Sequence, residues 1–277
     1  LLRTTGRDLG DLAGWLGMPS FGAPGSLRQV RYGMVLASES LRSLRRTVRL
    51  ARLARMRDFK LKVGFADDDA RVRLVAGMLR RGLRSGRMTL RLDANAAWDL
   101  PTAVEALNRW RDVPIAGVEQ PLSAGEDEAL VELRRQTGAH IFHDESLVTL
   151  EDAERLAAIG VADGFNIRLS KCGGMMPALR LARFARQRDI AIQLGCMVGE
   201  TSILSAAGVR YLGCVPGVRF CEGAFGGLLL AEDVTSRPVR FGIGGKPPRI
   251  AGEGLVGRVE EDLLHTHCVE EPIVMEL

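Results

Sequence analysis

The stretch "FKLKVG", residues 59–64, decides the fold of this chain. Phe59, Leu61 and Val63 alternate with Lys60 and Lys62, and alternate side chains of a β-strand point to opposite faces. One face of the strand is therefore apolar, while the other face carries two ammonium groups. Residues elsewhere in the sequence indicate what this second face does.

Lysine is scarce elsewhere in the chain. Of the 38 basic residues among 277, only four are lysine, namely Lys60, Lys62, Lys171 and Lys246. Arginine serves wherever a general surface cation is sufficient, but its guanidinium does not give up its proton in proteins. A lysine in this chain is therefore a candidate for proton transfer, and two of the four lie in the opening stretch.

Short apolar runs alternate with helical patterns from about residue 30 onward. Strict alternation predicts a parallel sheet with helices outside it, and eight strands favour a TIM-type barrel over an open sheet. No glycine-rich phosphate loop follows the first strands, which argues against a dinucleotide-binding fold. We predict an α/β fold, a TIM-type (β/α)7β barrel over residues 30–231, with Ser38 as the cap of the first helix. The expected strands lie at 32–38, 59–63, 88–93, 115–121, 139–144, 162–170, 190–196 and 217–223.

Charged side chains recur where the expected strands end, about one βα unit apart, and these ends meet at one rim of a barrel. Three carboxylates without a histidine or cysteine among them suit a hard divalent cation, Mg²⁺ first and Mn²⁺ as an alternative. Lysine-bearing strands flank the carboxylates on both sides, so a substrate carboxylate on the metal would have an ammonium group on each side. The charged residues are Lys60, Lys62, Asp93, Glu119, Asp144 and Lys171.

Five ordered motifs within residues 30–230 resemble the enolase superfamily, and within it the muconate-lactonizing subgroup of dipeptide epimerases, N-acylamino acid racemases, o-succinylbenzoate synthases and muconate cycloisomerases. They are "KLK", "DANAAW", "VEQP", "HDES" and "NIRLSKCGG". The resemblance implies that Asp93, Glu119 and Asp144 hold the metal. It also implies that Lys62 and Lys171 are the acid–base pair, while Lys60 supports the enolate and lowers the proton affinity of its neighbour.

The resemblance leaves the reaction open. The first expectation is Mg²⁺-dependent removal of the proton α to a carboxylate, giving epimerisation or racemisation of a dipeptide or N-acylamino acid. The alternatives are β-elimination or cycloisomerisation at the same site, or a scaffold that lacks its lid and is catalytically impaired. The candidate substrate-binding residues are Asn95, Arg168, Cys196, Met197 and Glu222; Glu222 either holds a substrate ammonium or makes local hydrogen bonds.

Residues 1–29 resemble the last helix of an N-terminal α+β capping domain with its linker, and residues 232–277 are expected to pack outside the barrel or on that domain. Without a lid, we expect metal binding but poor turnover. Five scattered cysteines indicate a cytoplasmic setting, and no apolar run is long enough to cross a membrane. Arginines spread over amphipathic segments without aromatic residues argue against nucleic-acid binding. The expected partners are a small carboxylate substrate and further copies of the chain in a homo-oligomer.

Overall fold

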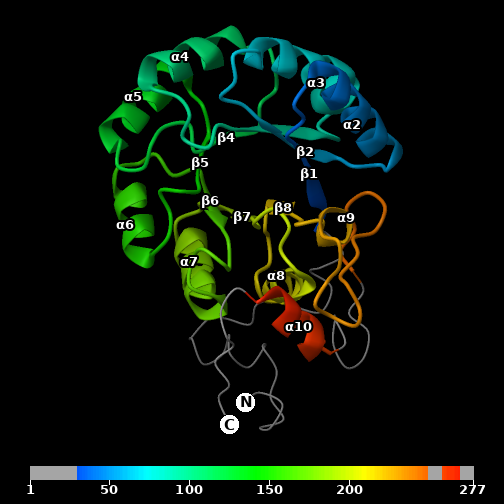
Figure 1. Cartoon of the computed structure of the whole chain (residues 1–277). Coiled ribbons are helices and arrows are strands. Elements are labelled where there is room, and N and C mark those ends of the chain that lie inside the picture. Colours follow the sequence, from blue (N-terminus) through cyan, green and yellow to red (C-terminus); the bar gives the residue numbers. More distant parts are fainter. Residues whose placement is uncertain (1–29, 249–257, 269–277) are drawn as a thin grey trace.

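Eight parallel strands, β1 to β8, close into a barrel in chain order, and helices surround it (Figure 1). This computed structural model describes residues 30–248 and 258–268, so the interpretation of residues 1–29 lies outside them. The TIM-type barrel is confirmed. Among the described residues, no helix combines the length and apolar character that crossing a membrane requires. The barrel consists of β1 (Tyr32–Leu36), α2 (Leu41–Leu53), β2 (Asp58–Lys62), α3 (Asp68–Arg84), β3 (Thr89–Asp93), α4 (Leu100–Arg109), β4 (Gly117–Glu119), α5 (Asp127–Thr137), β5 (Ile141–His143), α6 (Leu150–Ala158), β6 (Gly164–Ile167), α7 (Met175–Gln187), β7 (Ala191–Leu194), α8 (Ser202–Cys214) and β8 (Phe220–Glu222).

The two faces of β2 separate the outer core from the barrel interior. Phe59 and Leu61 are fully buried and belong to the same apolar cluster as Leu44 of α2 and Val75 of α3. Lys60 lies on the other face, where its ammonium reaches side chains of β3, β4 and β8. The apolar face of "FKLKVG" therefore packs against the helices, and its lysines face the barrel axis.

Aromatic side chains fill part of the barrel interior. The ring of Phe142 lies 5.7 Å from that of Phe220, measured between centroids. A Cβ atom at Gly117 or Gly164 would come within 2.6 Å or 2.2 Å of the Phe142 ring. Glycine on the strands on both sides of β5 thus makes room for a large side chain that points inward.

Two local expectations differ from the structure. Ser40, not Ser38, caps α2, because its hydroxyl accepts a hydrogen bond from Ser43 N at 3.2 Å. The carbonyl of Ser38 instead accepts a hydrogen bond from the buried Arg71 side chain at 2.6 Å. Lys171 does not end β6, which stops at Ile167; it lies in the turn before α7.

The chain after β8 forms two short helices, α9 (Gly226–Leu229) and α10 (Glu261–His267), and no further strand within the described residues. The ring of Phe241 lies 4.2 Å from that of Tyr32 at the start of β1. The carboxylate of Asp233 accepts a hydrogen bond from Ser202 N at 3.0 Å, at the first residue of α8. The described residues between 232 and 248 thus contact the outside of the barrel near β1 and α8.

Candidate active site

Lys60 lies at the centre of a buried group of charges. Its ammonium lies 3.0 Å from Asp93, 2.9 Å from Glu119 and 2.8 Å from Glu222, and only 5% of the residue is exposed. Burial alone would lower the pKa of Lys60, but the three carboxylates outweigh it and raise the pKa well above its usual value. Lys60 is therefore a fixed positive charge and cannot serve as a base near neutral pH.

Asp93 and Glu119 face one another across paired positions of β3 and β4. Burial and the neighbouring Glu119 raise the pKa of Asp93 to about 6. Burial also disfavours the charged form of Glu119, but Lys60 and Arg91 outweigh this effect and lower its pKa to about 2. The cations that surround this carboxylate pair stabilise Glu119 more than Asp93, and a further positive charge would stabilise both.

Polar residues inside three strands, none of them predicted from the sequence, complete this network. Asn166 and Gln193 each donate a hydrogen bond of 2.8 Å to Glu119. Arg91 lies 3.1 Å from Glu222, contacts Gln193, and is 1% exposed. Each lies between two apolar strand residues in the sequence, which is the signal for a polar side chain that faces the barrel interior.

Asp144 is held by its neighbours on both sides of β5. The amide oxygen of Gln120 accepts a hydrogen bond from Asp144 N at 3.1 Å, and Gln120 NH₂ donates to Leu122 O and Ser146 Oγ at 2.7 Å each. Lys171 donates a hydrogen bond of 2.7 Å to the Asp144 carboxylate, whose other oxygen contacts Arg168. The position of this acid is thus determined by β4 and by the turn after β6.

The two lysines expected to transfer protons lie on opposite sides of the barrel. Lys62 ends β2 and donates a hydrogen bond of 3.0 Å to Asn95 Oδ1. Lys171 follows β6, and β2 and β6 are separated by four steps around a closed barrel of eight strands. Burial, with Arg168 nearby, lowers the pKa of Lys171 to about 8, so a fraction of this amine is neutral near pH 7.

The three carboxylates provide the oxygen donors that a hard divalent cation prefers. Within the described residues they do not form a ready group of metal ligands. Instead, the ammonium of Lys60 lies between Asp93 and Glu119, and that of Lys171 lies against Asp144. The raised pKa of Asp93 indicates that these cations do not fully stabilise its charged form, so a further positive charge would stabilise it. The residues therefore fit Mg²⁺, which would take over part of the contacts that the ammonium groups make.

The remaining candidate substrate-binding residues lie around this group. Asn95 bonds Lys62, and Arg168 lies 3.1 Å from the sulfur of Met197, which is 49% exposed. Both oxygens of Glu222 contact Lys60, and one also accepts hydrogen bonds from Arg91 and Gln193.

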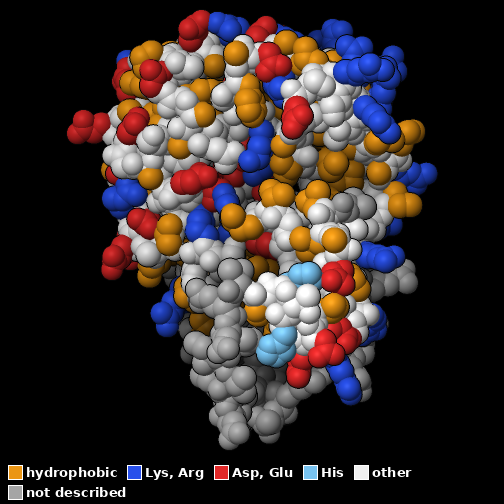
Figure 2. Space-filling model, in the orientation of Figure 1, with side chains coloured by type: hydrophobic (Ala, Val, Ile, Leu, Met, Phe, Trp, Pro, Cys, Tyr) orange, Lys and Arg blue, Asp and Glu red, His pale blue; other side chains and the backbone are white. Residues whose placement is uncertain are grey.

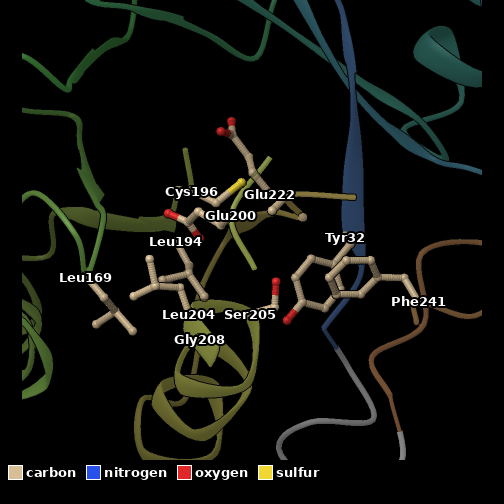
Figure 3. Close-up of a pocket in the computed structure, with 13 residues that line it drawn as sticks. Tyr32, Leu169, Leu194, Cys196, Glu200, Leu204, Ser205, Gly208, Glu222 and Phe241 are labelled. Atoms are coloured by element: carbon tan, nitrogen blue, oxygen red, sulfur yellow. The ribbon is translucent and has the colours of Figure 1, made fainter. Parts of the chain in front are cut away.

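Cys196 and Glu222 line a small cavity between β7, β8 and α8 (Figure 3). Its volume of about 20 Å³ holds roughly one water molecule. Burial raises the pKa of the Cys196 thiol, which therefore stays protonated. Glu200 also lines the cavity and accepts a hydrogen bond from Met197 N at 2.7 Å, which fixes the turn after β7. The cavity is too small for a substrate side chain.

The mouth of the barrel carries acids and lysines from successive strands, and this arrangement is typical of a site for acid–base chemistry. Comparison with known proteins identifies the family. Residues 43–261 match the family described as "Enolase C-terminal domain-like". The chain belongs to this family, and the resemblance to the muconate-lactonizing subgroup of the enolase superfamily is confirmed.

Curated relatives of the chain include epimerases, a racemase and cycloisomerases. Muconate cycloisomerase 1 of Rhodococcus opacus is 33% identical over 67% of this chain and 49% of its own length. The hydrophobic dipeptide epimerase of Enterococcus faecalis is 35% identical over 52% of this chain and 39% of its own length. The chain thus spans about half the length of the curated relatives it matches, or less.

Solved structures show the same barrel. A dipeptide epimerase from Cytophaga hutchinsonii, complexed with Mg and the dipeptide D-Ala-L-Val, gives a TM-score of 0.78 at 25% identity, over 92% of this chain and 66% of that one. Muconate cycloisomerase from Pseudomonas fluorescens gives a TM-score of 0.74 at 28% identity, over 86% of this chain and 65% of that one.

Proposed function

We propose that this chain supplies the acid–base site of an enzyme that removes the proton α to a carboxylate and returns it on the opposite face. The observation that carries the proposal is the placement of Lys62 and Lys171 on opposite sides of the barrel mouth. A base on each side of a planar carbon allows inversion. The substrate class that we favour is a dipeptide or an N-acylamino acid, since relatives at 35% and 33% identity are a dipeptide epimerase and an N-succinyl-L-Arg/Lys racemase.

The lysines of the site have different roles, which depend on whether each can release its proton. Lys171, with its pKa lowered to about 8, accepts or returns a proton at Nζ, and Lys62 does so from the other side. Lys60 stays protonated and stabilises the negative charge that develops on the substrate carboxylate. Bound Mg²⁺ or Mn²⁺ on Asp93, Glu119 and Asp144 would offset the same charge. Asn95 orients the Lys62 ammonium through their hydrogen bond.

Hydrogen exchange in D₂O tests this assignment. With Mg²⁺ present and a panel of dipeptides and N-acylamino acids, NMR should show deuterium entering the α-position together with inversion. Lys62→Ala and Lys171→Ala should each abolish exchange from one stereoisomer more severely than from the other. Lys246→Ala is the matched control, because Lys246 is an exposed lysine remote from the mouth motifs. Exchange that survives in both active-site variants would disprove the assignment.

A second candidate function is cycloisomerisation or β-elimination with the same residues. Both oxygens of Glu222 are already bonded to Lys60, so this acid is poorly available for a substrate ammonium, and a substrate without an amine is then favoured. One lysine would act as the base and the other as a fixed charge. Muconate, monitored by its ultraviolet absorbance, is the first substrate to test, since muconate cycloisomerase 1 of Rhodococcus opacus is 33% identical.

We further propose that the activity needs a divalent cation and takes place in the cytoplasm on a small carboxylate substrate. The oxygen-only donor set supports the first point and the scattered cysteines support the second. Removal of metal with EDTA should stop α-proton exchange, and added Mg²⁺ or Mn²⁺ should restore it. Exchange at an unchanged rate in EDTA would contradict the metal requirement.

A further inference from the structure

An exposed face of the outer helices carries nine arginines, which we call the arginine face. In the space-filling view, Lys and Arg side chains gather over α2 and α3 (Figure 2). Among the described residues, no salt bridge joins any of the nine to a carboxylate, whereas nearby Arg73 is paired with Asp112 at 2.6 Å. The arginine face consists of Arg45, Arg49 and Arg52 of α2, Arg55 and Arg57 of the following turn, Arg80, Arg81 and Arg84 of α3, and Arg87.

A groove with a volume of about 700 Å³ lies within the arginine face. Its walls include Arg52 and Arg81, while Met56, Met78 and Gly77 give it an apolar lining. A second hollow of about 300 Å³ shares Gly77 and Met78 and extends the groove toward Arg45 and Arg49. Positive walls over an apolar lining suit a ligand that is both acidic and apolar.

Local stabilisation of the helices does not explain the whole face. Arginine in the last turn offsets the partial negative charge of a helix C-terminus, which accounts for Arg52, Arg81 and Arg84. Arg55, Arg57 and Arg87 lie outside the helices, just before β2 and β3 begin. The start of a strand is at the opposite end of the barrel from the candidate active site, so substrate binding does not explain them either.

The chain also contains a segment with the complementary character. Residues 259–277 include six acidic residues and eight aliphatic or methionine residues but no lysine or arginine. Their described part, α10 with its flanking residues, exposes Glu260, Glu261 and Asp262, and none of these acids forms a salt bridge with a described residue. Residues 269–277, "VEEPIVMEL", lie outside the described residues. Figure 2 shows acidic side chains around α10, below the basic region over α2 and α3.

We propose that the arginine face binds residues 259–277 of a second copy of this chain. Charge complementarity carries the proposal: nine arginines that form no salt bridge with a described residue face six acids. The apolar groove accounts for the apolar residues of the segment. The two surfaces differ, so the contact is head to tail and builds a ring or an open chain of copies. Exposed charges drive it, so salt weakens it.

A labelled peptide of residues 258–277 tests the contact directly by fluorescence anisotropy. It should bind the full chain at low salt, and binding should fall at least tenfold when its six acids are replaced by amides. Arg49→Glu should weaken binding at least tenfold. Arg180→Glu is the matched control, because Arg180 is an exposed arginine of α7 and the charge change is the same. Equal affinity for the acidic and amide peptides would overturn the proposal, as would tighter binding of an oligonucleotide or of anionic vesicles.

Sedimentation velocity tests the contact in the intact chain. The weight-average mass should exceed 30.1 kDa, rise with protein concentration and fall toward that value in high salt. Arg49→Glu combined with Arg81→Glu should give a monomer, and adding Glu261→Arg with Glu270→Arg should restore association through exchanged charges. A mass that does not depend on concentration or salt, or a charge exchange that does not restore association, would overturn the proposal. α-Proton exchange is measured in parallel and should be unaffected, which keeps this test separate from that of the proposed function.

Discussion

Lys60 and Lys62 face the same side of one strand but have different surroundings. Side chains two residues apart on a strand are about 6.6 Å apart along it. This distance takes Lys62 out of the buried group of three acids around Lys60 and places it beside the uncharged Asn95. The first lysine is thus a permanent cation, whereas the second donates its hydrogen bond to a neutral amide. This difference is what proton transfer next to a stabilising charge requires.

His143 gives a stability prediction that can be tested by titration. Its ring is 1% exposed, faces away from the barrel axis and lies 3.2 Å from Val161 O, where a neutral Nε2–H can donate a hydrogen bond. Burial lowers the pKa of His143 from 6.5 to about 4. The unfolded chain therefore binds a proton that the folded chain does not, and stability falls as the pH falls from about 6.5 to about 4. The shift corresponds to a loss of about 3 kcal/mol in the free energy of unfolding.

Urea unfolding between pH 4 and 7.5 measures this effect. The difference in unfolding free energy between the wild type and His143→Gln, which cannot titrate, should change with pH in this window. The comparison cancels contributions of other groups, including Asp93. His140→Gln is the control, since His140 is an exposed histidine that precedes the same strand. A pH-independent difference between the wild type and His143→Gln would contradict the prediction.

At the scale of the elements, the alternation of apolar runs with helical patterns was enough to predict the barrel. The acids and lysines at the expected strand ends were enough to place the candidate residues around one rim. Arg91 and Gln193 were missed although they alternate with apolar residues in the same way. Their partners lie far away in the chain: Arg91 contacts a residue 102 positions later and another 131 positions later. The pattern indicates the face on which such a side chain lies, but only the closed barrel determines which charges meet there.

Gln120 links β4 to the turn after β5 and sets the position of Asp144. Its amide oxygen accepts from Asp144 N and Ser146 N, and its NH₂ group donates to Leu122 O and Ser146 Oγ. Gln120→Ala removes all four bonds, so the carboxylate that would hold Mg²⁺ loses its support. Removal of a group that orients a metal ligand typically lowers the metal affinity by about 10-fold to 100-fold. We expect Mg²⁺ binding, measured by calorimetry, to weaken within that range.

The control for this change is Gln136→Ala, which removes an exposed glutamine that bonds Glu132 within the same helix. Both measurements are made at a temperature where circular dichroism shows the variants to be folded, so that a general loss of structure does not mimic the effect. Unchanged Mg²⁺ affinity in folded Gln120→Ala would show that Asp144 keeps its position without this glutamine, or that it is not a metal ligand.

At the scale of the whole molecule, the sequence indicated where the βα repeat stops but not how the following residues attach to the barrel. Residues 241–246 form a tight turn against β1, in which Gly245 O accepts a hydrogen bond from Tyr32 N at 2.7 Å and Gly244 N donates one of 2.7 Å to Ala54 O. Glycines in "GIGGK" indicate a turn, but a turn motif does not identify the strand that it contacts. That contact joins residues more than 200 positions apart and depends on the barrel being closed.

Gly245 gives a test of how much this attachment stabilises the molecule. Its φ is +70°, and a Cβ atom there would lie 2.1 Å from the carbonyl oxygen of Tyr32, a backbone atom of β1. Gly245→Ala therefore combines an unfavourable backbone conformation with a clash that only a displacement of the turn or of β1 can relieve.

Gly86 has a similar φ of +67° but no atom within 4 Å of its Cβ position. Gly86→Ala should thus cost only the backbone term of about 1–2 kcal/mol. Gly245→Ala should lose a further 1–3 kcal/mol or so from overpacking, measured as the free energy of unfolding in urea. Equal losses in the two variants would mean that the turn can move away from β1 without weakening the barrel.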